Sequence, residues 1–320
     1  MPSTLIRKWL GAAAVVVALT IPAEAADRLR LAVSQKGQWD TSMPEFGVRE
    51  GFFQAEGLEL ELFYTNGTAE TQQAVISGSV DIGIAVGFLG LLAAYTKGAP
   101  VRVIAGEWTG ASDFFWYAKA DGPIRSLADA QGKTVGFSTV GSSSNLVILE
   151  LLRQANVRAR PTPTGGTAAT MTQVLSGQID VGWSQAPIGL DEVKGGKIRI
   201  VARGVEAKAL ADQTTRVSIT TAETLAAKRP VLERFMRAYQ RTLDWAYAEP
   251  KSIQYFAENL GIPREVAEAA RDESYPKAAM RLDAVQGLDT TMVQAIELKR
   301  LSAPLNAQQS AELIQIIRAR

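Results

Sequence analysis

Residues 67–83 read GTAETQQAVISGSVDIG, and residues 166–182 read GTAATMTQVLSGQIDVG. Aligned without a gap, at an offset of 99 residues, the two stretches share nine of their seventeen residues. Each copy predicts a helix that begins after Gly-Thr and ends at Ser-Gly, because a glycine there adopts the left-handed conformation that closes a helix. A turn then leads into a strand that contains Asp81 or Asp180 at its start. The repeat therefore predicts two similar α/β lobes, with the same helix and strand at the same place in each.

The sequence around the repeat alternates between strand-like and helix-length segments. This alternation indicates βαβ units and mostly parallel sheets. After about residue 222 helices take over, and the apolar spacing of residues 230–248 fits an amphipathic helix. The strand-like runs are residues 29–33, 58–64, 81–86, 101–108, 114–119, 134–137, 179–183, 198–203 and 216–220.

Composition excludes several classes of function. Lys and Arg number 34 against 33 Asp and Glu, and no basic tract stands out, which disfavours nucleic acid as a partner. The chain has no Cys and no His, so thiol nucleophiles, disulfides, Cys/His zinc sites and imidazole catalysis are excluded. We expect no metal, no cofactor and no catalytic residue. The sequence has no Gly-x-Ser-x-Gly motif of a serine hydrolase. Glycoside hydrolysis by a pair of carboxylates is not excluded.

The N-terminus predicts export. Arg7 and Lys8 precede the uncharged run of residues 10–21, and Ala-Glu-Ala follows at residues 23–25. This order is typical of a secretory signal peptide, cleaved here near Ala25. A membrane anchor is the alternative, but a spanning helix needs about 20 apolar residues. We expect residues 1–25 to be removed and the protein to act in the periplasm.

Three further stretches join the repeat in resembling a known family. Residues 50–59 (EGFFQAEGLE), 126–136 (SLADAQGKTVG) and 141–144 (GSSS) resemble the periplasmic solute-binding proteins of ABC importers. The most similar branch binds sulfonate, nitrate or taurine and includes relatives that bind a thiamine precursor. The resemblance implies an α/β, two-lobed periplasmic-binding-protein fold of type II, with the ligand cleft between the lobes. It also implies a monomer that works with an ABC permease in the inner membrane.

The two lobes are expected to be discontinuous in sequence. Residues 26–117 and 217–320 would form lobe 1, and residues 118–216 would form lobe 2. The chain would cross between them near residues 117–121 and 214–217.

The serine-rich stretch after residue 137 is the first candidate ligand site. Ser142, Ser143 and Ser144 follow a strand and begin an apolar helical run. Backbone N–H groups at a helix start are unpaired, and the helix dipole there favours an anion. The hydroxyls would add donors to a ligand. Simple capping is the alternative, because Ser is a preferred N-cap.

Equivalent positions in the two repeats predict facing walls of one cleft. Gly87 and Phe88 follow the first-repeat strand, and Trp183 and Gln185 lie at the corresponding place in the second. Ligands of open α/β sheets gather at the carboxyl ends of strands, so we expect ligand contacts here. Core packing is the alternative for Phe88.

The loop after the first strand is expected to form the rim of the cleft. Gln35 and Trp39 lie in it, and Trp39 is placed to cover an apolar or aromatic ligand. A surface loop without ligand contact is the alternative. Whether Asp40 or Glu107 contacts the ligand stays open.

These features predict a binding protein and not an enzyme. The expected ligand is a small organic anion such as a sulfonate, taurine or nitrate, delivered to an ABC importer. One alternative is a heteroaromatic such as a thiamine-precursor pyrimidine, with Asp40 or Glu107 available for its ring nitrogens. An enzyme on the same fold is the other alternative, but the desulfinase of this fold depends on a Cys nucleophile.

Overall fold

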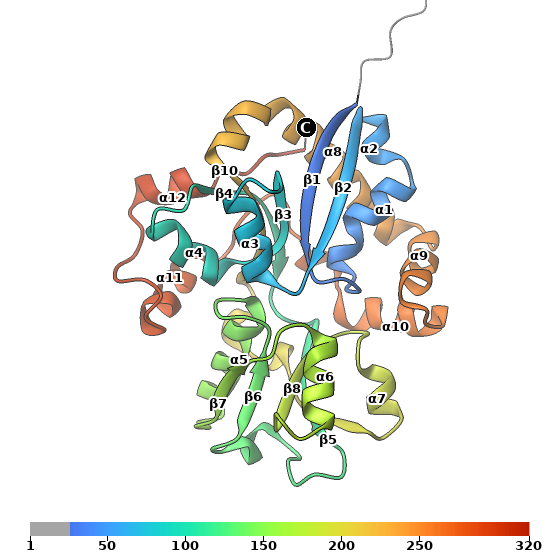
Figure 1. Ribbon diagram of the computed structural model, residues 1–320, viewed down its shortest axis with the longest axis vertical. Coiled ribbons are helices and arrows are strands. Elements are labelled where there is room, and N and C mark those ends of the chain that lie inside the picture. Colours follow the sequence, from blue (N-terminus) through green and yellow to red (C-terminus); the bar gives the residue numbers. More distant parts are fainter. Residues whose placement is uncertain (1–25, 320) are drawn as a thin grey trace, which may run out of the picture.

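Two five-stranded sheets form the frame of the protein, one above the other in Figure 1. The computed structural model describes residues 26–319. The predicted signal peptide, residues 1–25, lies outside the described residues. Across residues 26–319, no helix has both the length and the apolar character that crossing a membrane requires. The α/β, two-lobed fold class predicted from the sequence is confirmed.

The first sheet combines four parallel strands with one antiparallel strand inserted between them. β1 pairs in parallel with β2 and β3, whereas β10 runs antiparallel to both β3 and β4. Strand β2 alternates leucines with glutamates, so its leucines face the core while its glutamates face solvent. The strand order is β2 (Leu58–Thr65), β1 (Asp27–Ser34), β3 (Ile82–Gly87), β10 (Thr214–Thr221) and β4 (Val101–Thr109).

Helices cover both faces of the first sheet. Side chains that alternate along β1 and β3 enter two separate apolar clusters, one on each face. One face packs against α3 (Thr68–Ile76), α4 (Phe88–Thr96), α11 (Leu288–Glu297) and α12 (Ala307–Leu313). The other packs against α1 (Met43–Arg49), α2 (Phe52–Ala55), α8 (Ala222–Ala248), α9 (Lys251–Leu260) and α10 (Arg264–Ser274).

The second sheet repeats the pattern of the first. β6 runs parallel to β7 and β8, and β5 runs antiparallel to β8 and β9. Its order is β7 (Arg160–Pro163), β6 (Thr134–Phe137), β8 (Val181–Gln185), β5 (Phe114–Lys119) and β9 (Ile198–Arg203). Its helices are α5 (Ser143–Gln154), α6 (Thr167–Leu175) and α7 (Leu190–Lys194).

The sequence repeat corresponds to α3–β3 in one lobe and α6–β8 in the other. A Cβ added to Gly83 would lie 2.9 Å from Val75 Cγ2, and one added to Gly182 would lie 2.7 Å from Val174 Cγ2. Each glycine thus lets the repeat helix lie directly on its strand. Both helices end where the sequence predicts, before Ser-Gly.

The repeated aspartates also have one common task. Asp81 accepts the backbone N–H of Arg30 in β1, at 2.8 Å. Asp180 accepts the backbone N–H of Thr134 in β6, also at 2.8 Å. Each carboxylate therefore ties the start of its repeat strand to the neighbouring central strand of the same sheet.

The long helix α8 differs from the amphipathic helix predicted over residues 230–248. It begins at Ala222 and is interrupted at Lys228, whose φ of −118° and ψ of 19° are not helical. Pro230 causes this kink, because proline lacks an N–H donor and restricts the residues before it. The amphipathic part predicted from the sequence is the segment after the kink.

The chain passes between the sheets in two short segments. β4 of the first sheet ends at Thr109, and β5 of the second begins at Phe114. β9 of the second sheet ends at Arg203, and β10 of the first begins at Thr214. The division into lobes at residues 26–117 with 217–320, and 118–216, stays a prediction.

Candidate ligand-binding site between the sheets

A small polar pocket lies where the two sheets face each other. Strands β1 and β8 end at its wall with Ser34 and Gln185, so it sits at the carboxyl ends of strands from both sheets. Its cavity volume is about 20 Å³. The first sheet and its helices contribute Ser34, Gln35, Asp40, Thr41, Gly67, Thr68, Ala85 and Arg216, and the second contributes Phe114, Ser138, Ser143, Ser144, Trp183 and Gln185.

The pocket brings together five of the residues that the sequence singled out. They come from three segments that are far apart in sequence: the strand-end rule identified Gln35, Trp183 and Gln185, and the helix-start argument identified Ser143 and Ser144. Their contact with a ligand stays a prediction. The five are Gln35, Ser143, Ser144, Trp183 and Gln185.

The other four predicted residues lie outside the pocket lining, and Trp39 is the clearest difference. Its side chain is fully buried, and its ring centroid lies 5.5 Å from Phe46, 5.6 Å from Tyr247 and 5.3 Å from Phe256. Three edge-to-face aromatic contacts hold it in the core of the first lobe. The structure therefore places Trp39 in the core and not at the rim.

Gly87, Phe88 and Ser142 lie where the two lobes touch. A Cβ on Gly87 would be 2.8 Å from Ser142 Cα, so the two backbones are in direct contact. Beside them, Gly90 donates its N–H to the Gly141 carbonyl at 2.9 Å. Phe88 packs in the apolar cluster beneath this contact, with 1% of its surface exposed. These residues join the lobes at the edge of the pocket.

The three serines of the α5 start have different surroundings. Ser142 accepts the N–H of Asn145 at 3.1 Å and so caps the helix. Ser144 Oγ accepts the N–H of Ser138 at 3.0 Å. Among the hydrogen bonds of residues 26–319, none uses the hydroxyl of Ser143, which faces the pocket. Ser142 therefore has the capping role given above as the alternative, while the hydroxyl of Ser143 is available to a ligand.

A second helix also begins at the pocket. Gly67 and Thr68 start α3, and Thr68 Oγ1 accepts the N–H of Gly87 at 3.0 Å. The first N–H groups of α3 and α5 have no partner within their helices, and both dipoles present positive ends. One side of the pocket therefore favours an anionic or hydrogen-bond-accepting group.

Backbone strain is present at the same place. Gln35 and Ala85 adopt positive φ angles of 66° and 58°, although neither is glycine. Such conformations cost about 1–3 kcal/mol each and are retained where the surroundings impose them, often at ligand sites. Both residues line the pocket.

The sequence did not single out Arg216, which forms the charged floor of the pocket. Its Nη2 lies 3.1 Å from Asp40 Oδ2 and 2.9 Å from Asp113 Oδ2, and all three side chains are buried. The guanidinium carbon lies 5.1 Å from the Trp108 ring centroid and 5.2 Å from that of Phe114. The one sequence feature that could have indicated it is the position of this arginine at the start of the strand-like run 216–220.

These ion pairs leave hydrogen-bonding capacity unused. Within the described residues, Nε, Nη1 and Nη2 of Arg216 and both oxygens of Asp40 make no contact with hydrogen-bond geometry. Asp113 is different, because its Oδ2 accepts Gln185 Nε2 at 2.6 Å. Charge therefore holds the cluster together, while several donors and acceptors remain available.

Burial dominates the ionisation of the two carboxyls deepest in the first lobe. It raises the pKa of Asp40 from 3.8 to about 6, although the Arg216 charge opposes the shift. It also raises the pKa of Glu107 from 4.5 to about 8, against hydrogen bonds donated by Ser218 and Tyr239. Asp40 lines the pocket, whereas Glu107 does not.

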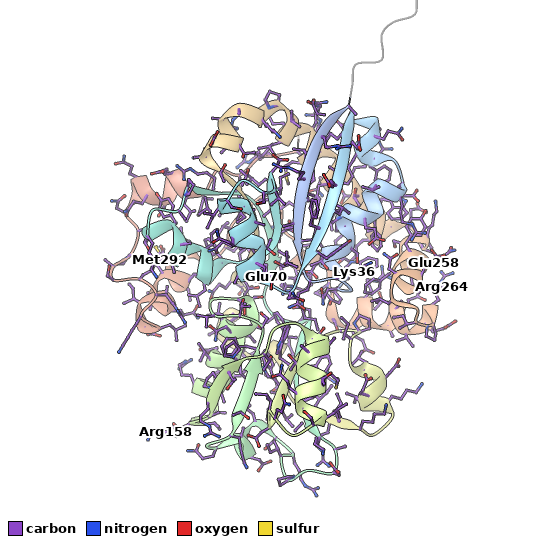
Figure 2. The ribbon with its side chains drawn as sticks, viewed as in Figure 1. Lys36, Glu70, Arg158, Glu258, Arg264 and Met292 are labelled. Carbon is purple, nitrogen blue, oxygen red and sulfur yellow. The ribbon has the colours of Figure 1, made fainter. Side chains whose placement is uncertain are left out.

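Lys36 is exposed beside the pocket. Its ammonium lies 5.3 Å from the Tyr64 ring centroid, and the residue does not line the cavity. Figure 2 shows Lys36 and Glu70 at the level where the first lobe approaches the second. In residues 26–319, acidic side chains form no group of three or more that could hold a metal ion.

Comparison with curated proteins gives two relatives. A 4-amino-5-hydroxymethyl-2-methylpyrimidine phosphate synthase of Aspergillus parasiticus is 26% identical over 217 residues, covering 63% of this chain and 61% of the synthase. The chain thus matches less than two thirds of that enzyme's length. The riboflavin-binding protein RibY of Chloroflexus aurantiacus is 26% identical over 289 residues, covering 82% of this chain and 78% of RibY.

Solved structures share the fold. The alkanesulfonate-binding protein SsuA of Xanthomonas axonopodis pv. citri has a TM-score of 0.76 at 17% identity, covering 91% of this chain and 99% of SsuA. The desulfurization enzyme DSZB has a TM-score of 0.62 at 15% identity, covering 88% of this chain and 95% of DSZB. The chain therefore has the periplasmic-binding-protein fold, which hosts both binding proteins and an enzyme.

The comparisons confirm the resemblance that the sequence motifs indicate, both to sulfonate-type binding proteins and to thiamine-precursor relatives. A family model described as NMT1/THI5 like matches residues 46–253, well over half of the chain. The chain belongs to the NMT1/THI5-like family.

Proposed function

We propose that this protein is the solute-binding component of an ABC importer, acting in the periplasm as a monomer. It captures one small organic solute between its two sheets and delivers it to a membrane permease. The observation that carries this proposal is the polar pocket at the strand ends, which residues of both sheets line. The solute-binding names of RibY and SsuA support the same role.

The small size of the pocket implies that the lobes open and close. A cavity of about 20 Å³ has room for water but not for an organic solute. The walls must therefore separate for a solute to enter. A bound solute then shifts the equilibrium between open and closed forms through its different affinity for each.

The first ligand class is a small organic anion, such as a sulfonate, taurine or nitrate. The starts of α3 and α5 both contribute to the pocket wall, through Thr68 and Ser143. Helix N-termini bind anionic groups through unpaired N–H groups and the helix dipole. The SsuA structure, which was solved with MOPS bound, supports this class.

A second ligand class is a small heteroaromatic, such as an aminopyrimidine. Phe114 and Trp183 line the pocket with their ring centroids 6.0 Å apart, which gives the wall an aromatic surface. Asp40 offers a carboxylate for ring nitrogens or amino groups. The pyrimidine and riboflavin in the names of the two curated relatives support this class.

We propose that the protein binds without turnover, because it has neither Cys nor His for an activated nucleophile. The test is a thermal-shift screen of sulfonates and pyrimidines, followed by incubation with each hit and mass spectrometry of the small molecule. We expect saturable binding and an unchanged ligand mass. Steady conversion above a boiled control would show an enzyme instead.

A further inference from the structure

Asp40 is a carboxylate whose surroundings leave it unsatisfied. It follows the loop after β1, opens the short 3-10 turn Asp40–Ser42 and lines the pocket with 1% of its surface exposed. Its near charge of opposite sign is Arg216, at 3.1 Å, and the backbone N–H groups of Asp40 and Thr41 act on it only weakly. Within residues 26–319, neither carboxylate oxygen has a partner with good hydrogen-bond geometry. A buried charge without hydrogen bonds is costly, so the site favours a molecule that supplies them.

The charge of Arg216 is shared with a second carboxylate. Asp113 lies closer to it, at 2.9 Å, and is further fixed by the amide of Gln185 at 2.6 Å. Asp113 pairs with Arg216 by charge but is not among the residues that line the pocket. Two carboxylates around one guanidinium leave an excess of negative charge, and Asp40 is the one that faces the cavity.

The pocket therefore has two unlike sides. The starts of α3 and α5 present N–H groups and Ser143 presents its hydroxyl, whereas Asp40 presents only acceptors. A ligand that carried nothing but an anionic group would leave Asp40 unsatisfied and would be repelled by it. A ligand with an amino group or another N–H donor would satisfy both sides at once.

We propose that Asp40 determines specificity by accepting an amino or other N–H group of the ligand, so that the ligand carries such a donor beside its anionic or aromatic part. This inference rests on the proposed solute-binding function. It applies to both ligand classes, because an aminosulfonate and an aminopyrimidine share the donor.

The test uses two pairs of probes that differ in one amino group. Taurine is compared with ethanesulfonate, and 4-amino-5-hydroxymethyl-2-methylpyrimidine with its analogue that has hydrogen in place of the amino group. Titration calorimetry measures each affinity. We expect the aminated member of at least one pair to bind at least tenfold more tightly, because a hydrogen bond to a charged group is stronger than one between neutral groups.

Two variants separate recognition from a merely structural role. Asp40→Asn should reduce the preference for the aminated probe at least fivefold. Asp81→Asn is the matched control, since Asp81 is also buried and ion-paired, to Lys228 at 2.8 Å, but lies away from the pocket. It should keep the preference of the wild type even if it lowers stability.

Three results would overturn the inference: equal or tighter binding of the probes without the amino group, a full preference in Asp40→Asn, or no binding of any of the four probes. If Asp40→Asn does not fold, the affinities of the wild type for the aminated and non-aminated probes still test the inference. The proposed function is tested separately, by whether native mass spectrometry finds any small molecule bound to the purified chain. A bound solute without an N–H donor would overturn the role of Asp40 and leave the solute-binding function standing.

Discussion

Ser143 and Ser144 are adjacent residues with different expected effects when changed. Ser143→Ala removes a hydroxyl that faces the pocket, so affinity for the best ligand of the screen should fall by about 1–3 kcal/mol. Ser144→Ala leaves the buried N–H of Ser138 without its acceptor, so the free energy of unfolding should fall by about 1–3 kcal/mol. Calorimetric titration and urea unfolding of both variants measure the two effects. Equal affinity of Ser143→Ala and wild type would assign Ser143 to the helix start alone.

Glu107 should make the protein less stable as the pH rises. Burial raises its pKa from 4.5 to about 8, so the native state binds a proton that the unfolded state has released. The favourable contribution is complete below pH 4.5 and is lost as the pH rises towards 8. Asp40, with its pKa raised to about 6, adds in the same direction at lower pH.

Glu107→Gln tests this directly, because glutamine has nearly the same shape and does not titrate. Melting temperatures from pH 5 to 8.5 should decline less in the variant than in the wild type. The variant should gain stability relative to the wild type as the pH rises. Parallel curves for the two proteins would mean that Glu107 has an ordinary pKa.

Part of the candidate site could be predicted from residue types and strand ends. Gln35 and Trp183 were found because they lie at the ends of strands, and Ser143 because it begins a helix. Arg216 was missed, since its partners Asp40 and Asp113 come from distant segments and only the folded chain brings them together. Trp39 was misplaced because its loop turns inward, where aromatic residues of α8 and α9 surround it.

At the scale of elements, the start of α4 and the loop before α5 form the contact between the lobes. Gly90 donates to the Gly141 carbonyl, and a Cβ on Gly90 would lie 2.9 Å from that oxygen. Backbone atoms cannot rotate away, so a larger residue must push the lobes apart. A substitution at Gly90 can therefore change the closure of the lobes without weakening helix α4.

Gly90→Ala should weaken ligand binding at least tenfold without lowering stability. Alanine favours a helix over glycine by about 1 kcal/mol, so α4 itself gains while the closed arrangement loses. Titration calorimetry and urea unfolding measure the two quantities on the same variant. Unchanged affinity would show that the contact plays no part in holding the ligand.

The elements themselves could largely be predicted from local patterns. The repeat helices and their Ser-Gly ends are confirmed, and the nine strand-like runs became every strand from β1 to β10 except β7, which the sequence patterns did not indicate. Strand order could not be derived from them. β10 inserts between β3 and β4 although most of the chain of the second sheet separates it from both, and long-range pairing of this kind leaves no local signal.

At the scale of the whole molecule, two sheets of one pattern meet around a pocket too small for an organic solute. The sequence indicated this arrangement through its repeat, whose identical glycines and aspartates make the same contacts in both lobes. Periodicity alone does not reveal how closely the lobes approach. That distance depends on side chains of both sheets, including the glycines at the contact and the charged cluster on the floor.

Whether a small solute binds between the two sheets can be measured by native mass spectrometry of the chain, purified without dialysis and then exposed to the sulfonate and pyrimidine panel. We expect one small molecule per chain, with the mass of the free compound unchanged over hours. It also predicts loss of that adduct in Ser143→Trp, whose added ring would fill the pocket while circular dichroism confirms the fold. No adduct with any compound, equal occupancy in Ser143→Trp, or a converted ligand would contradict a solute-binding protein with its site between the sheets.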